Sequence, residues 1–482
     1  MKHRYRLDCD VKTSFEPSDV ARWAGGEWNG IAPERITGFS IDTRSLQPGN
    51  LFVALRGEHA DGHRFLGQAV ARGAAGVVVE DVASLNGLAT ARLKVDSTRA
   101  ALGRIARGYR STLDARMVAV TGSVGKTTVK ELIADMVQPI GPAARTLGNW
   151  NNDLGLPLSL LAATPDIRFG VFEVGMNHPG ELDPLCDILE PDVGVVTCVG
   201  PVHIENFTGL PAIAEEKAAV YRGLRGKGAA VLNADDAHAD ILGRYAQGNR
   251  MVTVSSRDGA DYVYRRNTGD SGTFEVLEQA TGDVVVFTAA LPGDYFVLDA
   301  VLAAATARIL GAPWPVITHA VQFYQPLALR WTRHTWFGVR TINDAYNANP
   351  VSVRAAVQAF GEEPVEGRRW LVLGGMLELG VNEERMHRET GAGLAAFPAM
   401  RLVTVGPRGR WLAEGALAAG MPSDRVAVCA DHAAAAALLD DAVAPGDALL
   451  FKASRGEAVE RVLEAWRLRR DASAGETRTA NH

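Results

Sequence analysis

The stretch RMVAVTGSVGKTTVKELIADMV (Arg116–Val137) decides the fold class of this chain. It consists of a short apolar strand, a loop with two glycines and a helix, which is the pattern of a phosphate-binding loop. In such a loop, backbone N–H groups and the positive end of the helix dipole surround phosphate oxygens. Lys126 would neutralise the β- and γ-phosphates, and the Thr127 hydroxyl would reach Mg²⁺. The other expected nucleotide contacts in the loop are Gly122, Ser123, Gly125 and Thr128.

The spacing of this loop is the shorter form GxxGKT, because Val120 rather than glycine stands five residues before Gly125. A chance Gly-Lys turn before a helix is the alternative interpretation. The order of strand, loop, lysine, two threonines and helix favours the phosphate site.

The segments around this loop alternate between strands and helices, which is typical of parallel sheets with helices on both faces. A polar alternating stretch at residues 261–289 predicts an antiparallel hairpin, and an alanine-rich helix is expected over Leu298–Leu310. Short apolar runs that end in Gly, Asn or Asp predict strands buried on both faces. In the middle third these runs are RMVAV (Arg116–Val120), FGVFEVG (Phe169–Gly175), VGVVTCV (Val193–Val199) and AAVLN (Ala229–Asn233).

Three α/β domains are expected, because 482 residues correspond to about three domains of average size. A segment with three prolines, Gly311–Trp331, predicts an interdomain connection. We place the boundaries near Leu113 and Leu329, which gives domains 1–113, 114–328 and 329–482. A helix is expected over Gly456–Arg470, and the polar tail 471–482 is expected to be disordered. The last domain carries four further strand candidates, WLVLGGM (Trp370–Met376), RLVTVG (Arg401–Gly406), RVAVCA (Arg425–Ala430) and ALLFKAS (Ala448–Ser454).

Composition excludes several classes of protein. Hydrophobic residues make up 47% of the chain, so a mainly disordered protein is excluded. The net charge of −6 argues against a nucleic-acid-binding or membrane-surface protein. The four cysteines form no CxxC pair, which indicates a reducing cytoplasm rather than a disulfide framework or zinc site. No apolar run approaches the ~18 residues that span a bilayer, so a cytoplasmic protein without membrane insertion is expected.

Two polar residues follow predicted strands of the sheet that carries the phosphate loop. Glu173 ends FGVFEVG, and His203 follows VGVVTCV. Ligands of α/β sheets bind at the carboxyl ends of strands, where a carboxylate can hold Mg²⁺. Taken singly, Glu173 fits a solvated loop acid and His203 a structural hydrogen-bonding residue. Their shared position at the ends of strands favours a metal site.

Lys217 lies in the middle of an apolar helix face. In the predicted helix Pro211–Gly223, residues such as Ile213 and Val220 fall within about 60° of it. An unpaired ammonium in that position is costly. Lys217 should therefore have a buried anionic partner or be chemically modified. A lysine that snorkels from the edge of the face is the alternative.

These motifs resemble the ATP-dependent Mur ligases over nearly the whole chain. TGSVGKTT is similar to the family's ATP loop, FEVGMNH and VGPVHIENF to its magnesium-binding segments, and AEEKAAV to the segment with its carbamylated lysine. The resemblance implies ATP, two Mg²⁺ ions and a carbamate on Lys217 as cofactors. It implies catalytic roles for Lys126, Glu173, His203 and Lys217, and metal ligation by Thr127, Glu173, His203 and carbamylated Lys217.

Two further segments, TLGNWNNDLGLPLSLL and INDAYNANPVSVRAAV, are similar to the family member that adds D-alanyl-D-alanine. The N-terminal IDTRSLQPGNLFVALRGEHADGHRF is similar to the UDP-binding module that this member shares with the sibling that adds diaminopimelate or lysine. The resemblance implies an N-terminal UDP-binding module, a central P-loop ATPase-like domain with a mostly parallel sheet, and a closing Rossmann-like C-terminal domain. It implies nucleotide contacts at Asp299, Arg330 and Asp344, and substrate contacts at Thr43, Arg44, Asn149, Asn151, Asn152, Tyr346, Asn347 and Asn349.

The implied reaction joins UDP-N-acetylmuramoyl-tripeptide to D-alanyl-D-alanine through an acyl phosphate, in cytoplasmic peptidoglycan precursor synthesis. The expected partners are these two substrates, and the chain is expected to act as a monomer. Three alternatives remain: the sibling that adds diaminopimelate or lysine, a folylpolyglutamate synthase, and a degenerate paralogue that binds nucleotide without turnover. The last is motivated by two departures from the family pattern, where Tyr295 replaces a histidine and Asp299 an asparagine. A further departure is Gly375, which stands where the family usually has an aspartate.

Overall fold

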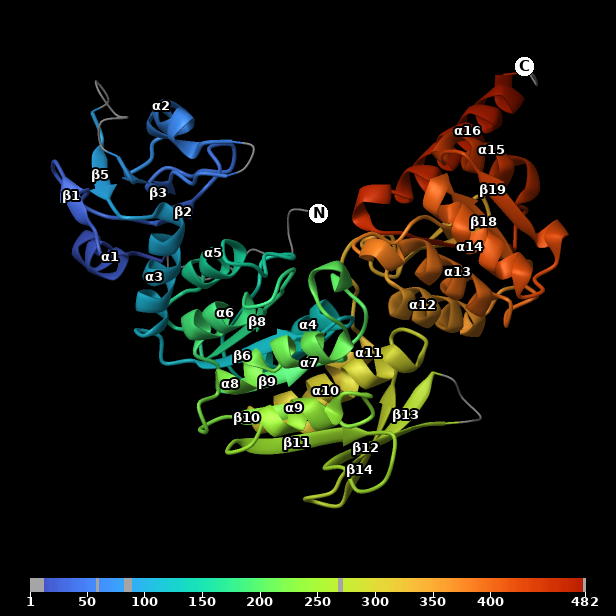
Figure 1. The fold of residues 1–482 in the computed structure, drawn as a ribbon, viewed down its shortest axis with the longest axis horizontal. Helices are drawn as coiled ribbons and strands as arrows, with labels where there is room; N and C mark the ends of the chain where they lie inside the picture. Colours follow the sequence, from blue (N-terminus) through green and yellow to red (C-terminus); the bar gives the residue numbers. More distant parts are fainter. Residues whose placement is uncertain (1–12, 58–59, 82–88, 268–271, 480–482) are drawn as a thin grey trace.

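The computed structural model describes residues 13–57, 60–81, 89–267 and 272–479, and three α/β lobes follow one another along the chain (Figure 1). Each lobe is built on its own sheet, of five, nine and six strands. We propose domain boundaries after residues 113 and 328, in the connections that join these sheets. None of the helices in the described ranges is both long and apolar enough to cross a membrane.

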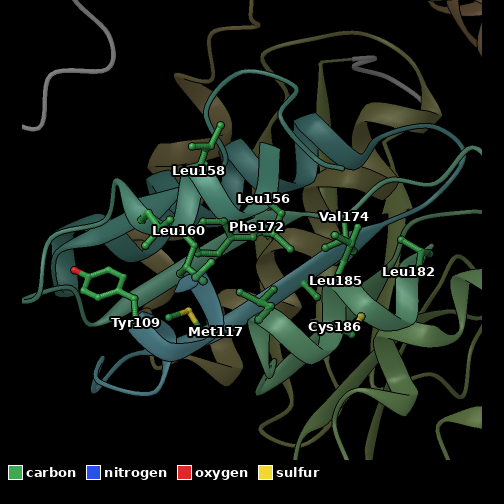
Figure 2. Close-up of a cluster of buried hydrophobic side chains, with 14 of the residues drawn as sticks. Tyr109, Met117, Leu156, Leu158, Leu160, Phe172, Val174, Leu182, Leu185 and Cys186 are labelled. Atoms are coloured by element: carbon green, nitrogen blue, oxygen red, sulfur yellow. The ribbon is translucent and has the colours of Figure 1, made fainter. Parts of the chain in front are cut away.

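The N-terminal sheet has the order β1-β5-β4-β3-β2 and is parallel except for β1, which pairs antiparallel with β5. Helix α3 packs against α5 (Gly155–Leu161) and α6 (Leu182–Leu189) of the central lobe, and Leu102, Ile105 and Tyr109 lie on its buried face. Figure 2 shows Tyr109 among the buried side chains of this cluster. The elements of this lobe are α1 (Pro17–Ala24), β1 (Glu27–Asn29), β2 (Gly38–Ser40), β3 (Asn50–Val53), α2 (Leu66–Ala71), β4 (Gly76–Val79), β5 (Ala91–Lys94) and α3 (Thr98–Arg110).

The central sheet has the order β14-β13-β12-β11-β10-β9-β6-β8-β7, and it is parallel from β7 to β12. All four predicted strands are confirmed, and the predicted hairpin is the antiparallel β12–β13–β14 extension. The strands are β6 (Arg116–Thr121), β7 (Ala143–Arg145), β8 (Phe169–Glu173), β9 (Val193–Val196), β10 (Ala229–Asn233), β11 (Arg250–Ser255), β12 (Tyr262–Arg266), β13 (Thr273–Glu278) and β14 (Asp283–Thr288).

The helices of the central lobe cover both faces of this sheet (Figure 1). Helix α10 is apolar on nearly all sides, and it is buried against the sheet and against α4, the helix of the phosphate loop, which packs beside it on the same sheet. The helices are α4 (Lys126–Val137), α5 (Gly155–Leu161), α6 (Leu182–Leu189), α7 (Leu210–Lys217), α8 (Ala219–Arg222), α9 (Ala239–Tyr245), α10 (Asp294–Ile309) and α11 (Trp314–Gln322).

The C-terminal sheet has the order β15-β16-β20-β17-β18-β19, with only β15 antiparallel among its pairs. Its four predicted strands are confirmed as β17 to β20. The elements are β15 (Thr332–Trp336), β16 (Val339–Asn343), α12 (Pro350–Glu362), β17 (Arg369–Leu373), α13 (Glu383–Leu394), β18 (Arg401–Val405), α14 (Gly406–Ala418), β19 (Val426–Cys429), α15 (His432–Ala442), β20 (Ala448–Lys452) and α16 (Glu460–Thr479).

Helix α16 continues to Thr479 and so enters the tail 471–482, for which disorder was expected. Adding residues to the end of α16 does not require a new helix to be nucleated, and alanine, glutamate and arginine are good helix formers. Residues 480–482 lie outside the described part of the chain.

Candidate functional site

The phosphate loop joins β6 to α4 and is shaped by its two glycines. Gly122 has φ 151° and Gly125 has φ 87°, in the region that L side chains rarely adopt. A Cβ atom on Gly122 would lie 1.8 Å from Thr197 Oγ1. Helix α4 has no side chain that caps its N-terminus, so its first N–H groups are available to an anion. Lys126 Nζ donates to the Gly122 carbonyl oxygen at 2.8 Å, which folds the lysine over the loop.

Two cavities meet at this loop. The first, of about 360 Å³, lies between the central and C-terminal lobes, and the second, of about 430 Å³, opens beside the loop after β7. The first cavity is lined by many of the site residues predicted from the sequence: Ser123, Gly125, Lys126, Thr127, Thr128, Asn151, Glu173, His203, Asp299, Arg330, Asp344, Tyr346, Asn347 and Asn349. They line the second at Gly122, Ser123, Lys126, Asn149, Asn151, Asn152, His203, Lys217 and Asn347.

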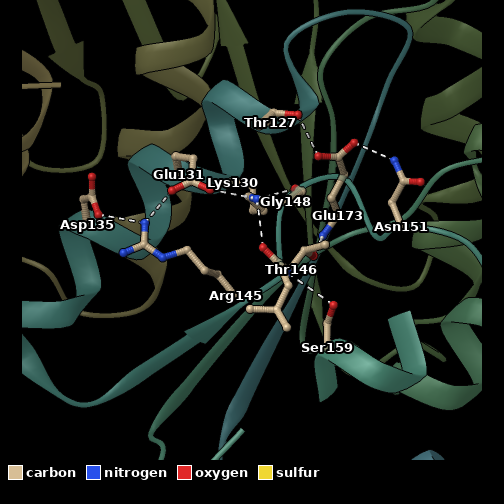
Figure 3. A network of polar contacts seen from close by, with 11 residues as sticks. Thr127, Lys130, Glu131, Asp135, Arg145, Thr146, Gly148, Asn151, Ser159 and Glu173 are labelled. Carbon is tan, nitrogen blue, oxygen red and sulfur yellow. Dashed lines mark hydrogen bonds and ion pairs between the residues drawn. The ribbon is translucent and has the colours of Figure 1, made fainter. Parts of the chain in front are cut away.

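Glu173 lies at the carboxyl end of β8 and is 2% exposed. Its Oε2 accepts a hydrogen bond from Thr127 Oγ1 at 2.8 Å, and its Oε1 accepts one from Asn151 Nδ2 at 2.7 Å (Figure 3). Burial opposes ionisation, but the charges of Lys126, Arg330 and Lys130 hold the pKa of Glu173 below its ordinary value. The structure therefore brings an ionised carboxylate and a threonine hydroxyl together, and both are oxygen ligands that suit Mg²⁺.

Lys217 ends α7 and is 2% exposed, as its place on the apolar helix face predicts. In the part of the chain that the structure describes, its ammonium has no hydrogen bond or ion pair. Burial, and next the positive charge of Lys126, lower the pKa of Lys217 to about 7. The side chain lines the second cavity, so a neutral amine is accessible there near neutral pH.

His203 lines both cavities, but it does not approach Glu173 as one member of a ligand cluster. Its Nδ1 lies 2.7 Å from Glu378 Oε2 of the C-terminal lobe, and this contact lowers the pKa of Glu378. Across the described ranges, no three His, Cys, Asp or Glu side chains are grouped closely enough to hold a metal. A metal beside Glu173 and Thr127 thus needs further ligands from substrate phosphates or from a modified side chain.

The C-terminal lobe supplies the opposite wall of the first cavity. The Arg330 guanidinium lies 3.8 Å from the ring centroid of Tyr346, a cation–π contact. Asp344 Oδ2 accepts a hydrogen bond from Lys452 Nζ at 2.6 Å. The Asn349 side chain caps α12, which makes it a local structural residue.

Lys452 is a cavity residue that the sequence analysis missed. It is 4% exposed, and its Nζ also donates to the Asn347 carbonyl oxygen at 3.0 Å. The signal was a lysine at the carboxyl end of the apolar run ALLFK, since buried strand ends are where charged groups meet ligands.

The three asparagines of the loop after β7 have different surroundings. Asn149 and Asn152 line the second cavity, and the Asn152 side chain accepts from the N–H groups of Leu154 and Gly155 at the start of α5. Asn151 also lines the second cavity, and its side-chain amide donates to Glu173. The predicted UDP contacts line neither cavity: Thr43 Oγ1 donates to Gln68 Oε1, and the Arg44 side chain pairs with Asp42.

Two of the departures from the family pattern, Gly375 and Asp299, have physical explanations. A Cβ atom on Gly375 would lie 2.7 Å from the Arg408 side chain, so a larger residue does not fit there. Asp299 lies against the phosphate loop: a Cβ atom added to Gly125 would be only 2.2 Å from Asp299 Oδ1. Burial raises the pKa of Asp299 to about 8, so near neutral pH this side chain is largely a neutral acid, closer in charge to the asparagine it replaces.

Family comparisons match all three lobes. Residues 35–110 match the "Mur ligase family, catalytic domain", residues 120–307 the "Mur ligase middle domain", and residues 330–455 the "Mur ligase, glutamate ligase domain".

Curated relatives extend over most of the chain. A UDP-N-acetylmuramoyl-tripeptide–D-alanyl-D-alanine ligase of Bacillus subtilis is 33% identical over 89% of this chain and 93% of its own length. The ligase of the same name from Escherichia coli is 35% identical over 79% of this chain and 83% of its own length.

Solved structures agree with this match. MurF from Acinetobacter baumannii superposes with a TM-score of 0.86 at 27% identity, covering 95% of this chain and 99% of that chain. MurF ligase from Thermotoga maritima in complex with ADP gives a TM-score of 0.77 at 26% identity, covering 89% of this chain and 97% of that chain.

Proposed function

The chain belongs to the Mur ligase family, and we propose that it is the ATP-dependent ligase that adds D-alanyl-D-alanine to UDP-N-acetylmuramoyl-tripeptide. The relatives that carry this name cover most of the chain at 33–35% identity. The observation in the structure that supports the proposal most directly is the meeting of two cavities at Lys126. One cavity contains the phosphate loop, and the other has room for an acid substrate beside it.

The proposed chemistry begins with the terminal carboxylate of the tripeptide, which attacks the γ-phosphate of ATP and forms an acyl phosphate and ADP. The amine of D-alanyl-D-alanine then attacks the acyl carbon. The C–O bond to phosphate breaks, a proton leaves the nitrogen, and the products are amide and inorganic phosphate. The first step brings two anions together, so cations must offset their repulsion. Lys126 and Arg330 line the first cavity and supply positive charge there.

Bound Mg²⁺ would screen the phosphate charge and orient the γ-phosphate for attack. Thr127 and Glu173 fit as its ligands because their oxygens already adjoin. His203 is held by Glu378 in this conformation, so a ligand role would require that contact to open.

The proposal also includes carbamylation of Lys217. A lysine takes up CO₂ only as the neutral amine. Burial lowers the pKa of Lys217 to about 7, so the neutral amine is present near neutral pH. The carbamate would place an anion beside Lys126, whose charge now disfavours the Lys217 ammonium. It would also supply the ligand that the described acidic and histidine residues do not.

The remaining assignments belong to the same proposal. Residues 13–113 would bind the UDP end of the precursor, and the first cavity would bind ATP against Asp299, Arg330 and Asp344. The C-terminal lobe would bring in the dipeptide. Because ATP and UDP-linked precursors are cytoplasmic metabolites, we place the reaction in the cytoplasm, with the protein acting as a monomer.

A substrate-matrix assay tests the proposal. The purified protein is given ATP, Mg²⁺ and UDP-N-acetylmuramoyl-tripeptide with D-alanyl-D-alanine, diaminopimelate, lysine or glutamate, and phosphate release is followed. We expect release with D-alanyl-D-alanine only. Release with a single amino acid and none with the dipeptide would assign the chain to a different ligase of the family. Nucleotide binding without turnover of any pair would indicate a degenerate paralogue.

A further inference from the structure

Asn151 was expected to contact the sugar-peptide, but its side-chain amide points to the carboxylate of Glu173 (Figure 3). We propose that Asn151 is a positioning residue for Glu173, and that it links the order of the loop over residues 146–152 to the binding of magnesium and nucleotide. This inference rests on the proposed function, because it assumes that Glu173 is a metal ligand.

The geometry of Glu173 is that of an oriented ligand rather than a blocked one. Each of its two oxygens accepts one side-chain hydrogen bond, from Thr127 and from Asn151. A carboxylate has about four lone-pair directions, so each oxygen keeps one for a cation. Its backbone N–H donates to Thr146 Oγ1 at 2.7 Å, which fixes the residue at its base as well. Partners of this kind orient metal ligands and tune their affinity.

Asn151 is itself fixed in place. Its carbonyl oxygen accepts a hydrogen bond from the Gly175 N–H at 2.8 Å. A Cβ on Gly175 would lie 2.7 Å from Asn151 Cγ, so only glycine lets the asparagine pack there. These contacts hold the Asn151 backbone in place and pack its side chain against Gly175.

The start of the same loop is attached to the helix that follows the phosphate loop. Lys130 of α4 is fully buried, and its Nζ donates to the carbonyl oxygens of Thr146 at 3.1 Å and Gly148 at 3.3 Å (Figure 3). Glu131 balances the charge, with its Oε1 2.8 Å from the Lys130 Nζ. One helix thus carries Thr127 at its phosphate end and holds the substrate loop through Lys130.

These contacts make the loop a mechanical link between two sites. Asn149 and Asn152 line the second cavity, while the side-chain amide of Asn151 donates to Glu173, the carboxylate proposed to bind the metal. If precursor binding orders the loop, it also orients Glu173, and magnesium-nucleotide binding must favour precursor binding by the same factor.

The test measures how strongly Mg²⁺ tightens ADP binding. Calorimetry gives the Kd for ADP with saturating Mg²⁺ and with a chelator, and the ratio of the two is the coupling factor. Asn151→Ala should lower the coupling factor by roughly 10-fold, as for other partners of metal ligands, and leave the chelator value unchanged. Asp153→Ala is the matched control, because Asp153 follows the same loop, pairs with Arg99 and lines neither cavity, and it should keep the wild-type factor.

A double-mutant cycle shows whether Asn151 acts through Glu173. In a Glu173→Gln background, Asn151→Ala should change the coupling factor no further. An unchanged factor in Asn151→Ala, or a larger one, would overturn the inference, since the amide would then be irrelevant to the metal or compete with it. Either result leaves the proposed function standing if the wild type couples ADP to Mg²⁺. No coupling in the wild type would refute the metal role and the inference together.

Discussion

At the residue scale, burial changes the chemistry of two charged side chains in the proposed site. Lys217 and Asp299 are both almost fully buried, and burial moves the pKa of each toward neutrality, downward to about 7 for the lysine and upward to about 8 for the acid. Such groups change charge within the physiological range, where ordinary lysines and aspartates do not.

Replacing Lys217 tests the proposed carbamate. Lys217→Ala should lower turnover by on the order of 10²-fold or more, since a ligand of the metal is lost. In the wild type the neutral amine forms as pH rises through about 7, so carbamylation should increase over that window. Magnetic resonance of protein incubated with isotope-labelled bicarbonate checks this directly. A short-chain carboxylic acid should restore part of the activity of the variant, whereas full activity without it would contradict the metal role.

Replacing Asp299 gives a pH signature in stability. The carboxyl pKa is about 8 in the folded chain and about 4 in the unfolded chain, so between these values the folded state holds a proton that the unfolded state has lost. The contribution of Asp299 to the free energy of unfolding therefore falls as pH rises from about 4 to about 8. Asp299→Asn removes the effect, so its denaturation midpoint should exceed that of the wild type by a margin that grows from about pH 4 to about pH 8. A margin independent of pH would contradict the assignment.

At the element scale, the contact between two short 3₁₀ helices joins the central lobe to the C-terminal lobe. Helix η4 (Ile204–Asn206) of the central lobe packs against η5 (Gly380–Asn382) of the C-terminal lobe. His203 and Glu378, which flank them, both have positive φ, of 51° and 64°. Non-glycine residues with this left-handed backbone conformation are strained, and such strain often occurs in functional segments.

Gly380→Ala should weaken this interlobe contact. Gly380 has φ 60°, and an added Cβ would lie 2.7 Å from Glu205 Cβ, so the lobes must separate or the backbone must shift. Small-angle scattering of the ADP-bound protein should show a larger radius of gyration, and turnover should fall. Gly393→Ala, in helix α13 with open space around it, is the control and should behave as wild type. Equal scattering curves for both variants and wild type would show that this contact does not hold the lobes.

The sequence predicted the elements better than it predicted their long-range contacts. Apolar runs ending in glycine or asparagine located the strands, and strand ends located Glu173. The contact between His203 and Glu378 joins residues 175 positions apart in different lobes, and no local pattern encodes it. The direction of Asn151 depends on Gly175, which approaches it only after β8 is in place. Periodicity placed Lys217 correctly because helical geometry is local.

At the scale of the whole molecule, the three lobes divide the work of ligation. The nine-stranded sheet carries the phosphate loop, the N-terminal lobe is tied to it through α3, and the C-terminal lobe supplies Arg330 and Lys452 to the shared cavity. Closing a cavity between lobes excludes water, which would otherwise hydrolyse an acyl phosphate.

In the proposed reaction, the tripeptide carboxylate attacks the γ-phosphate of ATP. This step is tested most directly with UDP-N-acetylmuramoyl-tripeptide whose terminal carboxylate carries heavy oxygen, incubated with ATP, Mg²⁺ and D-alanyl-D-alanine. An acyl-phosphate route transfers one carboxylate oxygen to the released phosphate and leaves the other in the new amide, and mass spectrometry of both products measures this. We predict one heavy oxygen in each phosphate released. Unlabelled phosphate would rule out attack of the tripeptide carboxylate on the γ-phosphate.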